Sequence, residues 1–199
     1  MDIESSTFDF ASEYLDSEAL RNLGFLQVGD NVRISRNSTI VGVENVKIGS
    51  NVRIDSYNVI IARRGTLSIG NNVHIEPSSS LVAHFGITIG NFCTLSHGVR
   101  LFTASADYGG NYFTNSFPNP KFQVPISGSI VLEDHVIVGA NSVVLPSTTL
   151  SEGCAIGAMS LVRHSVDPWK IYGGNPLRFI RDRNRDIKEL GNALEMEFD

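Results

Sequence analysis

The stretch from Ile130 to Val162 decides the fold of this chain, because its apolar residues recur every six positions. Read in sixes from Leu132, it gives LEDHVI, VGANSV, VLPSTT, LSEGCA and IGAMSL. An α-helix would show a period near 3.6 and a simple strand a period of two, so neither explains this spacing. The residues that open each six are Leu132, Val138, Val144, Leu150, Ile156 and Val162, and the small or β-branched residues four places later are Val136, Ser142, Thr148, Cys154, Ser160 and Val166.

A period of six is typical of short strands that turn a corner and repeat, so that every opening residue points toward one central axis. Parallel strands about 4.8 Å apart would then stack into a prism, whose interior holds the opening residues and the small residues. The sequence therefore predicts an all-β solenoid in the form of a parallel β-helix.

The same pattern begins nearer the N-terminus. Four blocks, each 20 or 21 residues from the last, open with Val28-Gly-Asp-Asn, Ile48-Gly-Ser-Asn, Ile69-Gly-Asn-Asn and Ile89-Gly-Asn-Phe. Three sixes make one turn of a triangular prism, and the few extra residues widen a corner. Gly and Asn suit such corners because both tolerate a positive φ. We therefore expect the β-helix to span residues 28–168.

A long insertion, residues 102–129, interrupts the repeat between Leu101 and Ile130. It contains glycines, prolines and aromatic residues but no period of six. Long excursions from a regular scaffold are usually functional. We expect an ordered loop, because its aromatic side chains need a surface to pack on; they are Tyr108, Tyr112, Phe113, Phe117 and Phe122.

The two ends of the chain lie outside the repeat. Residues 1–27 form an N-terminal segment, in which a short helix is predicted from Ser12, its N-cap, to Asn22, with Leu15 and Leu20 facing inward and Gly24 ending it. Residues 169–199 form a C-terminal extension. There the pattern from Asn184 to Met196 predicts an amphipathic helix that covers the open end of the prism, with an apolar face of Ile187, Leu190 and Leu194.

Composition excludes several classes of function. The 199 residues carry a formal net charge of −5, which argues against nucleic acid or an anionic membrane as the main partner. We find no signal peptide and no long apolar run, and so expect a cytoplasmic protein that does not enter the membrane. Cys93 and Cys154 both fall on an inward small position of a hexad, which favours buried packing over a disulfide or a metal site.

These repeats resemble those of the hexapeptide-repeat acyltransferases, whose unit begins with an aliphatic residue, often followed by Gly, and has a small residue in the fifth place. The resemblance covers roughly residues 28–181. The tail IYGGNPLRFIRDR, residues 171–183, is similar to the C-terminal signature of that family, a Gly-Asn-Pro followed by basic residues. The segments LRNLGFLQVGDNVRIS and SADYGGNYFTN further resemble enzymes of the viosamine and anthrose type, which N-acylate nucleotide-linked 4-amino-4,6-dideoxy sugars.

The resemblance implies a left-handed β-helix and an enzyme that uses acetyl-CoA, or another acyl-CoA, as co-substrate and no metal. It implies direct transfer to the amine of a nucleotide-linked sugar, for cell-surface polysaccharide or glycan biosynthesis. It also implies a homotrimer with each site between neighbouring subunits, one of which supplies the loop and the other the last turns.

An acceptor must lose a proton during acyl transfer, and histidine is the commonest side chain that takes one. His97, just before the insertion, and Asp107, at its start, are the leading candidates for a base. Ser96 could orient the substrate or His97. In the resembling enzymes the loop carries two acidic residues before an aromatic residue and a Gly, and here the first of them is Ala106. The candidates for substrate binding are His84, Tyr108 and His135.

The resemblance assigns the coenzyme to the last turns. Ala140 and Ala158 each follow a glycine and match corners where backbone groups of the family bond the pantetheine arm. Three arginines match basic positions that meet the nucleotide phosphates, for which the guanidinium fork is suited. They are Arg163, Arg178 and Arg181.

Three alternatives remain open at this point. The first is O-acetylation of a sugar or polysaccharide hydroxyl, which requires a histidine base. The second is a zinc-dependent β-helix like the β-helical carbonic anhydrases, although the five histidines are too far apart in sequence to form a pair of ligands on one turn. The third is a β-helix that only binds partners and catalyses nothing.

Overall fold

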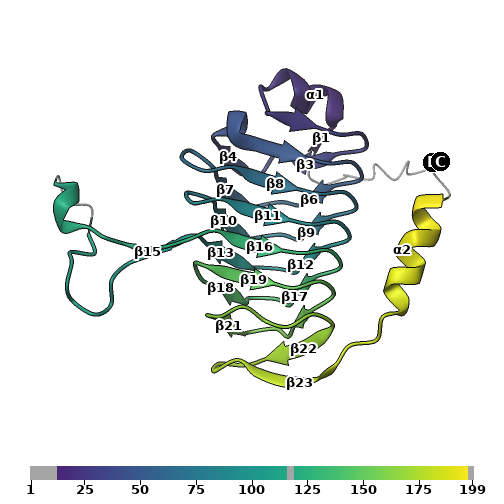
Figure 1. Cartoon of the computed structure of the whole chain (residues 1–199). Helices are drawn as coiled ribbons and strands as arrows, with labels where there is room; N and C mark the ends of the chain where they lie inside the picture. The colour runs from purple at the N-terminus through teal and green to yellow at the C-terminus, as the bar shows by residue number, and fades with distance from the viewer. Residues whose placement is uncertain (1–12, 116–118, 197–199) are drawn as a thin grey trace, which may run out of the picture.

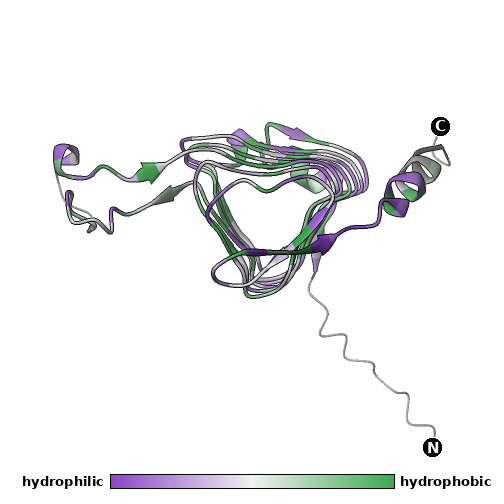
Figure 2. Ribbon diagram, turned by 60° about the horizontal axis from the view of Figure 1, so that its bottom comes forward, coloured by the Kyte–Doolittle hydropathy of each residue, from purple (hydrophilic) through white to green (hydrophobic). Residues whose placement is uncertain are grey.

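The computed structural model describes residues 13–115 and 119–196, and this part of the chain forms a β-solenoid. Its short strands stack into three long sheets, which are the faces of a prism (Figure 1). Seen nearly end on, the prism is triangular, and the insertion leaves one corner while the C-terminal helix lies beyond another (Figure 2).

The three sheets take their strands from successive turns. Sheet A contains β1 (Tyr14–Leu15), β3 (Arg33–Ser35), β6 (Arg53–Ile54), β9 (His74–Ile75), β12 (Thr94–Leu95), β17 (Ile137–Val138), β20 (Ala155–Ile156), β22 (Lys170–Gly173) and β23 (Arg178–Asp182). Sheet B contains β2 (Gln27–Val28), β5 (Val46–Ile48), β8 (Leu67–Ile69), β11 (Ile87–Ile89), β16 (Ile130–Leu132) and β19 (Thr148–Leu150). Sheet C contains β4 (Thr39–Val41), β7 (Val59–Ile61), β10 (Ser80–Val82), β13 (Arg100–Phe102), β18 (Val143–Val144) and β21 (Leu161–Val162).

The opening residues of the hexads fill the interior of the prism. They stack on one another from turn to turn, as Leu95 does between Ile75 and Val138. In the stretch from Ile130 to Val162, every opening residue is at most 2% exposed, and every residue in the fifth place is at most 7% exposed. The period of six therefore predicted the interior correctly.

The two cysteines belong to this interior. Cys93 and Cys154 are buried and unpaired, and burial raises the pKa of each thiol to about 12. The thiols therefore remain protonated at neutral pH and pack as small apolar residues, as the sequence predicted.

Three corners join the sheets, and we name each after its residues. The aromatic corner joins sheet B to sheet A and contains Phe92 and His135. The histidine corner joins sheet A to sheet C and contains His97. The loop corner joins sheet C to sheet B and contains His84 and the insertion.

The Gly-x-Asn sequences of the early blocks lie at the aromatic corner. A Cβ at Gly70 would lie 2.8 Å from the backbone carbon of Gly90, so the second place of this early block has no room for a side chain. The third place accepts a backbone hydrogen bond from the preceding turn, as Asn91 Oδ1 does from the Asn71 N–H at 2.8 Å. The fourth place has a positive φ, and it is held by Asn31, Asn51, Asn72, Phe92 and His135.

The histidine corner differs from the aromatic corner in its fifth place, which is mostly polar there and apolar at the aromatic corner. Its buried hydroxyls satisfy backbone groups of the next turn. The Val99 N–H donates to Ser79 Oγ at 3.2 Å, and the Ser160 N–H donates to Ser142 Oγ at 3.1 Å. These hydrogen bonds let the corner turn tightly without leaving buried donors unpaired.

The insertion leaves the loop corner as a two-stranded antiparallel stem of β14 (Ala104–Ser105) and β15 (Ile126–Ser127). Beyond the stem the loop extends away from the prism and contains a 3-10 helix, η2 (Pro120–Phe122) (Figure 1). The side chains of Tyr108, Phe113 and Phe122 are at least half exposed. These aromatic residues therefore face solvent rather than the prism, and Phe117 lies outside the described residues.

The N-terminal helix is shorter than predicted. Helix α1 spans Ser17–Asn22, and Asp16 caps it by accepting a backbone hydrogen bond of 2.9 Å from its first turn. The two residues expected in its first turn instead form β1, which pairs antiparallel with β3 and covers the free edge of sheet A. Ser12, the expected N-cap, lies outside the described residues, whereas Leu20 is buried as predicted. A 3-10 helix, η1 (Val43–Asn45), widens the first loop corner.

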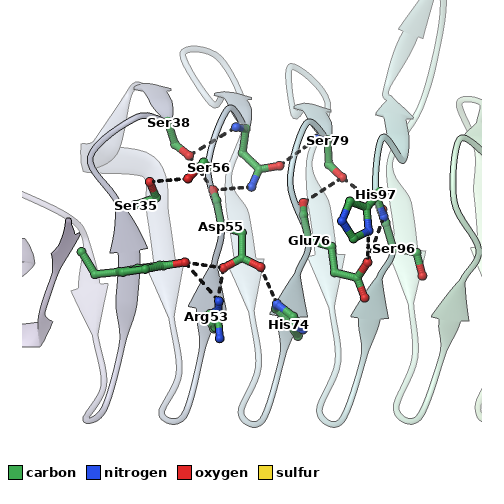
Figure 3. A network of polar contacts seen from close by, with 12 residues as sticks. Ser35, Ser38, Arg53, Asp55, Ser56, His74, Glu76, Ser79, Ser96 and His97 are labelled. Atoms are coloured by element: carbon green, nitrogen blue, oxygen red, sulfur yellow. Dashed lines mark hydrogen bonds and ion pairs between the residues drawn. The ribbon is translucent and has the colours of Figure 1, made fainter. Parts of the chain in front are cut away.

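A buried carboxylate ties β1 to the following turns (Figure 3). Asp55 Oδ1 accepts hydrogen bonds from the Tyr14 hydroxyl and from Arg53 Nε, both at 2.6 Å, and Oδ2 lies 2.8 Å from His74 Nε2. Burial alone would raise the pKa of Asp55. The hydrogen bonds from Tyr14, His74 and Arg53 more than offset burial, so the pKa lies below its ordinary value.

The solenoid continues past residue 168, because β22 pairs in parallel with β20. Strand β23 then folds back antiparallel onto β22. The expectation that the C-terminal helix covers the open end is wrong, because α2 (Asp186–Met196) runs along the aromatic corner (Figures 1 and 2). Among the described residues, no helix is long and apolar enough to cross a membrane.

The aromatic corner explains the position of α2. Phe92 and His135 provide stacked rings there and Trp169 adds a tilted one, whereas earlier turns present asparagines. Gly191 brings the helix close to them, since a Cβ at this residue would lie 3.1 Å from the His135 ring. Of the predicted apolar face, Ile187 is partly buried and Leu190 is 68% exposed, and the Leu194 side chain lies outside the described residues.

Leu81 tests the inward orientation of the hexads, because it is fully buried between turns of the prism. Leu81→Ala is expected to lower the free energy of unfolding by about 2–5 kcal/mol, since it removes buried methyl groups and leaves a cavity. Urea unfolding followed by circular dichroism measures the loss. Ser80→Ala, one residue earlier and on the outer surface, is the control and should cost about 0.5 kcal/mol or less. Equal losses would contradict the orientation.

Asp55 predicts a dependence of stability on pH. Because its pKa is lower in the folded chain, its contribution is present above the unfolded-state value of about 3.9 and is lost as the pH falls through the folded-state pKa. Asp55→Asn should therefore destabilise the chain more at pH 7 than at pH 3, measured by urea unfolding at both values. Asp30→Asn, on an exposed aspartate, is the control. If Asp55→Asn lowers the free energy of unfolding by the same amount at both pH values, this account is refuted.

Candidate active site

The histidine corner changes in character along the prism. In the early turns, the second place of the hexads at this corner is held by Asp55 and then by Glu76. In the next turn, Ser96 holds the second place and His97 the third. The last three turns carry only small residues in these two places, namely Gly139-Ala140, Gly157-Ala158 and Gly173-Gly174, which we call the bare strip. The bare strip ends at His97, three strand spacings or about 14 Å from Gly173.

Close packing between turns accounts for Gly139 in the bare strip. A Cβ at Gly139 would lie 2.8 Å from the backbone carbon of Gly157. Ala140 and Ala158 follow in the third place and present only methyl groups at the surface. A slender ligand could therefore lie against the backbone along this corner.

His97 forms a pair with a carboxylate from the preceding turn (Figure 3). Glu76 Oε2 accepts the His97 backbone N–H at 3.2 Å and also contacts Nδ1 of the His97 ring. The Glu76 side chain is 24% exposed and that of His97 is 66% exposed. The carboxylate thus holds one ring nitrogen, which leaves Nε2 for an external partner. Ser96 precedes His97 on the same turn, and its carbonyl accepts a hydrogen bond from Ser79 Oγ at 3.3 Å.

The loop corner contains a second group of candidates, around a cleft of about 440 Å³ under the stem of the insertion. His84 and Asp107 line this cleft together with Phe113, Asn115 and Gln123. His84 Nδ1 is buried and has no hydrogen-bond partner among the described residues. We expect this nitrogen to carry the lone pair, because a buried N–H without a partner is rare. Nε2 of His84 would then be the donor.

Asp107 has a local structural task. Its carboxylate accepts hydrogen bonds from the backbone N–H groups of Gly109 at 2.7 Å, Asn111 at 2.7 Å and Tyr112 at 3.1 Å. These bonds, led by the one from Gly109, lower the pKa of Asp107 below its ordinary value. The geometry therefore fits a residue that shapes the loop. Tyr108 beside it is 92% exposed.

The three arginines lie near the C-terminal end of the prism. Arg178 is paired with Gly173, so it lies at the far end of the bare strip. Arg163 lines a cavity of about 290 Å³ together with His164 and Phe179. Arg181 is paired with Ile171, farther along β23. Arg178 is therefore the best placed of the three to meet a ligand that lies along the strip.

His135 is separated from both groups. Its ring stacks on Phe92 with centroids 5.0 Å apart and lies 6.0 Å from the ring of Trp169, at the aromatic corner. Arg183 Nη1 donates to its carbonyl at 2.8 Å. The side chain is nearly buried under α2, so the structure gives His135 a packing environment. Within residues 13–115 and 119–196, no group of three or more His, Cys, Asp or Glu side chains could hold a metal ion.

One chain therefore brings the candidates together at two separate corners. Ser96, His97, Ala140 and Ala158 share the histidine corner, and His84, Asp107 and Tyr108 share the loop corner. Sheet C separates the two corners by the length of a three-residue strand, about 10 Å.

Sequence reasoning missed Glu76. Its signal was present, because Glu76 precedes His97 by 21 residues and the blocks repeat every 20 or 21 residues. Residues separated by one block lie on adjacent turns, so this spacing alone predicts that the two side chains are neighbours.

Comparison with known proteins places the chain among acyltransferases. No protein-family model matches the sequence. The chain is 36% identical over 182 residues to the dTDP-4-amino-4,6-dideoxy-D-glucose acyltransferase of Escherichia coli, which covers 92% of this chain and 95% of the relative. It is 32% identical over 124 residues to a chloramphenicol acetyltransferase of Klebsiella aerogenes, which covers 56% of this chain and 58% of that relative.

The solved structures give the same result. AntD, an N-acyltransferase from Bacillus cereus in complex with dTDP and 3-hydroxybutyryl-CoA, matches with a TM-score of 0.89 at 34% identity, over 94% of this chain and 98% of AntD. Another AntD structure holds dTDP-4-amino-4,6-dideoxyglucose and coenzyme A. Since the likeness extends over nearly the whole of each chain, this protein belongs to the hexapeptide-repeat acyltransferase family, in the group that contains AntD and the Escherichia coli enzyme.

Proposed function

We propose that this acyltransferase transfers the acyl group of an acyl-CoA to the amine of a nucleotide-linked amino-dideoxy sugar. The observation that carries this proposal is the bare strip that leads to His97 at the histidine corner. A pantetheine arm is slender and carries amide groups, so it suits a strip of backbone without large side chains. Its thioester would then lie beside the only histidine of that corner among the described residues.

The donor half of the site follows the bare strip. Ala140 and Ala158 would lie against the pantetheine arm, where a larger side chain would block it. Arg178, at the far end, would meet the phosphates of the coenzyme with its guanidinium fork. Arg163 and Arg181 would add positive charge at the same end of the prism. Acetyl-CoA is the donor we expect first.

The acceptor half of the site lies at the loop corner. The cleft of about 440 Å³ there is large enough for part of a small polar ligand. His84 would donate a hydrogen bond to an oxygen of the nucleotide sugar through Nε2, and the exposed ring of Tyr108 would contact the nucleotide. The Escherichia coli enzyme and AntD, which match nearly the whole of this chain, support a dTDP-linked amino sugar as the acceptor.

In the proposed reaction, the sugar amine attacks the carbonyl carbon of the thioester. His97 Nε2 accepts the proton that the nitrogen loses, the C–S bond breaks, and the proton passes to the departing thiolate of the coenzyme. Transfer is direct, because the two cysteines are buried with raised pKa values and neither could form an acyl-enzyme.

The two halves would meet in a homotrimer. Most outward residues of sheet C are apolar, namely Val41, Val59, Ile61, Val82, Phe102, Val143 and Leu161, although Thr39, Ser80 and Arg100 lie among them. The outside of sheet B carries mainly polar residues such as Lys47, Ser68 and Thr88. An apolar face of this kind favours association with a second copy. Sheet C lies between the histidine corner and the loop corner. If sheet C faces a three-fold axis, the loop corner of one copy lies beside the histidine corner of the next.

We place this reaction in the cytoplasm, because nucleotide-linked sugars and acyl-CoA are made there. The acylated sugar would then serve the biosynthesis of a cell-surface polysaccharide or another glycan. A hydroxyl acceptor is the second candidate, and the pair of Glu76 and His97 favours it, because an alcohol needs a stronger general base than an amine does.

A thiol-release assay with acetyl-CoA tests the proposed function. The acceptors are dTDP- and GDP-linked 3-amino and 4-amino sugars, the matching hydroxy sugars and free monosaccharides. Rapid release with a nucleotide-linked amino sugar is the expected result, because the amine is the better nucleophile. Release only with hydroxyl acceptors would move the assignment to O-acetylation, and silence with every acceptor would reject the proposed function.

Mixed trimers test the shared site. His97→Ala should lower kcat about 10²-fold or more, since general-base catalysis contributes about 10²–10⁴. His84→Ala should weaken the binding of the nucleotide sugar in the acceptor half of the site. If the two residues act in one site from different subunits, dissociating and reassembling an equal mixture of the two variants should restore activity above that of either variant alone. A mixture no more active than its components would contradict a site shared between subunits.

A further inference from the structure

We propose that Glu76 is the positioning residue of His97, and that acyl transfer depends on this carboxylate although it touches neither substrate. The inference rests on the acyl transfer proposed above and adds to it a residue from the preceding turn of the solenoid.

One carboxylate oxygen of Glu76 makes both contacts with His97. Oε2 accepts the backbone N–H of His97 at 3.2 Å and contacts Nδ1 of the ring. The ring is thereby tied to the backbone of its own residue, which restricts its rotation. An ionised carboxylate can only accept, so Nδ1 carries a proton, and in the neutral ring Nε2 then carries the lone pair. Nε2 is the nitrogen that a base needs to present to the acceptor.

Glu76 is itself held on a rigid part of the prism. Its N–H donates to the carbonyl of Leu95 at 2.8 Å, and its carbonyl accepts from Ser79 Oγ at 3.3 Å (Figure 3). Pro77 follows directly and fixes the next backbone angle. A carboxylate with a fixed backbone and a mostly buried side chain can hold a partner in one orientation, which a mobile surface residue cannot.

The charge of the Glu76 carboxylate acts on His97 in addition to its orienting effect. When His97 accepts a proton from the acceptor, its ring becomes an imidazolium, and the adjacent carboxylate of Glu76 stabilises that charge. The contribution appears in the chemical step rather than in the binding of either substrate. A change at Glu76 should therefore lower kcat and leave KM for acyl-CoA nearly unchanged.

The chain contains a matched control at the aromatic corner. Glu133 occupies the second place of its hexad, as Glu76 does, and its Oε2 accepts the backbone N–H of Glu152 on the next turn at 2.8 Å. Glu152 holds the third place, which is the place of His97 at the histidine corner. The two glutamates therefore make the same backbone hydrogen bond, and only Glu76 contacts a histidine ring.

The test is a double-mutant cycle on the full chain, with kcat and KM measured by thiol release for Glu76→Gln, His97→Ala, their combination and Glu133→Gln. Glu76→Gln is expected to lower kcat about tenfold or more, which is part of the roughly 10²–10⁴-fold that general-base catalysis contributes. On the His97→Ala background the same change should have less than about a twofold effect, because its target is gone. Glu133→Gln should keep kcat within about twofold of the native chain.

Two results would overturn the inference while leaving acyl transfer intact. One is an equal loss of kcat from Glu76→Gln with and without His97, and the other is an equal loss from Glu133→Gln. A native chain that releases no thiol with any acceptor would overturn the proposed function itself, and the inference with it. Urea unfolding of both glutamine variants separates folding from catalysis, since similar midpoints are expected for the two.

Discussion

The stacking of one apolar residue on the next, six positions apart, is the constraint on which the rest of this structure depends. Leu95 lies between Ile75 and Val138, and the neighbouring turns repeat this arrangement in register. Since the register is fixed, every corner position also stacks from turn to turn and forms a column. The side chains in a column are neighbours although about 20 residues separate them in the sequence, so each corner can develop its own chemistry without disturbing the interior.

The columns show where the protein departs from its own pattern, and each departure has a consequence. At the aromatic corner, asparagine gives way to Phe92 and His135, and α2 packs there. At the histidine corner, side chains give way to the glycines and alanines of the bare strip, and the pair of Glu76 and His97 stands at its end. Sheet C carries a mostly apolar outer surface between two corners that each hold candidate site residues. In the proposed function, these departures let one regular scaffold combine a donor track, a base and an acceptor cleft.

The sequence predicted the interior well, because a period of six has one structural interpretation and the residues that carry it are apolar. It also contained the neighbour relation between Glu76 and His97 in its block length. The position of α2 could not be predicted, because it depends on Gly191 meeting the rings of Phe92 and His135, which lie on two turns far from it in the sequence. The strand β1 was missed because its partner is the edge of sheet A, and the role of Asp107 depends on backbone hydrogen bonds that only the folded loop shows.

A crystal structure of the assembled protein with bound coenzyme A tests the central claim most directly, namely that the bare strip carries the donor to His97. The account predicts that the pantetheine arm lies against Ala140 and Ala158, with its sulfur beside His97 and the loop of a neighbouring copy over it. Coenzyme A bound at the aromatic corner, or with its sulfur at the loop corner of the same chain, would contradict the account.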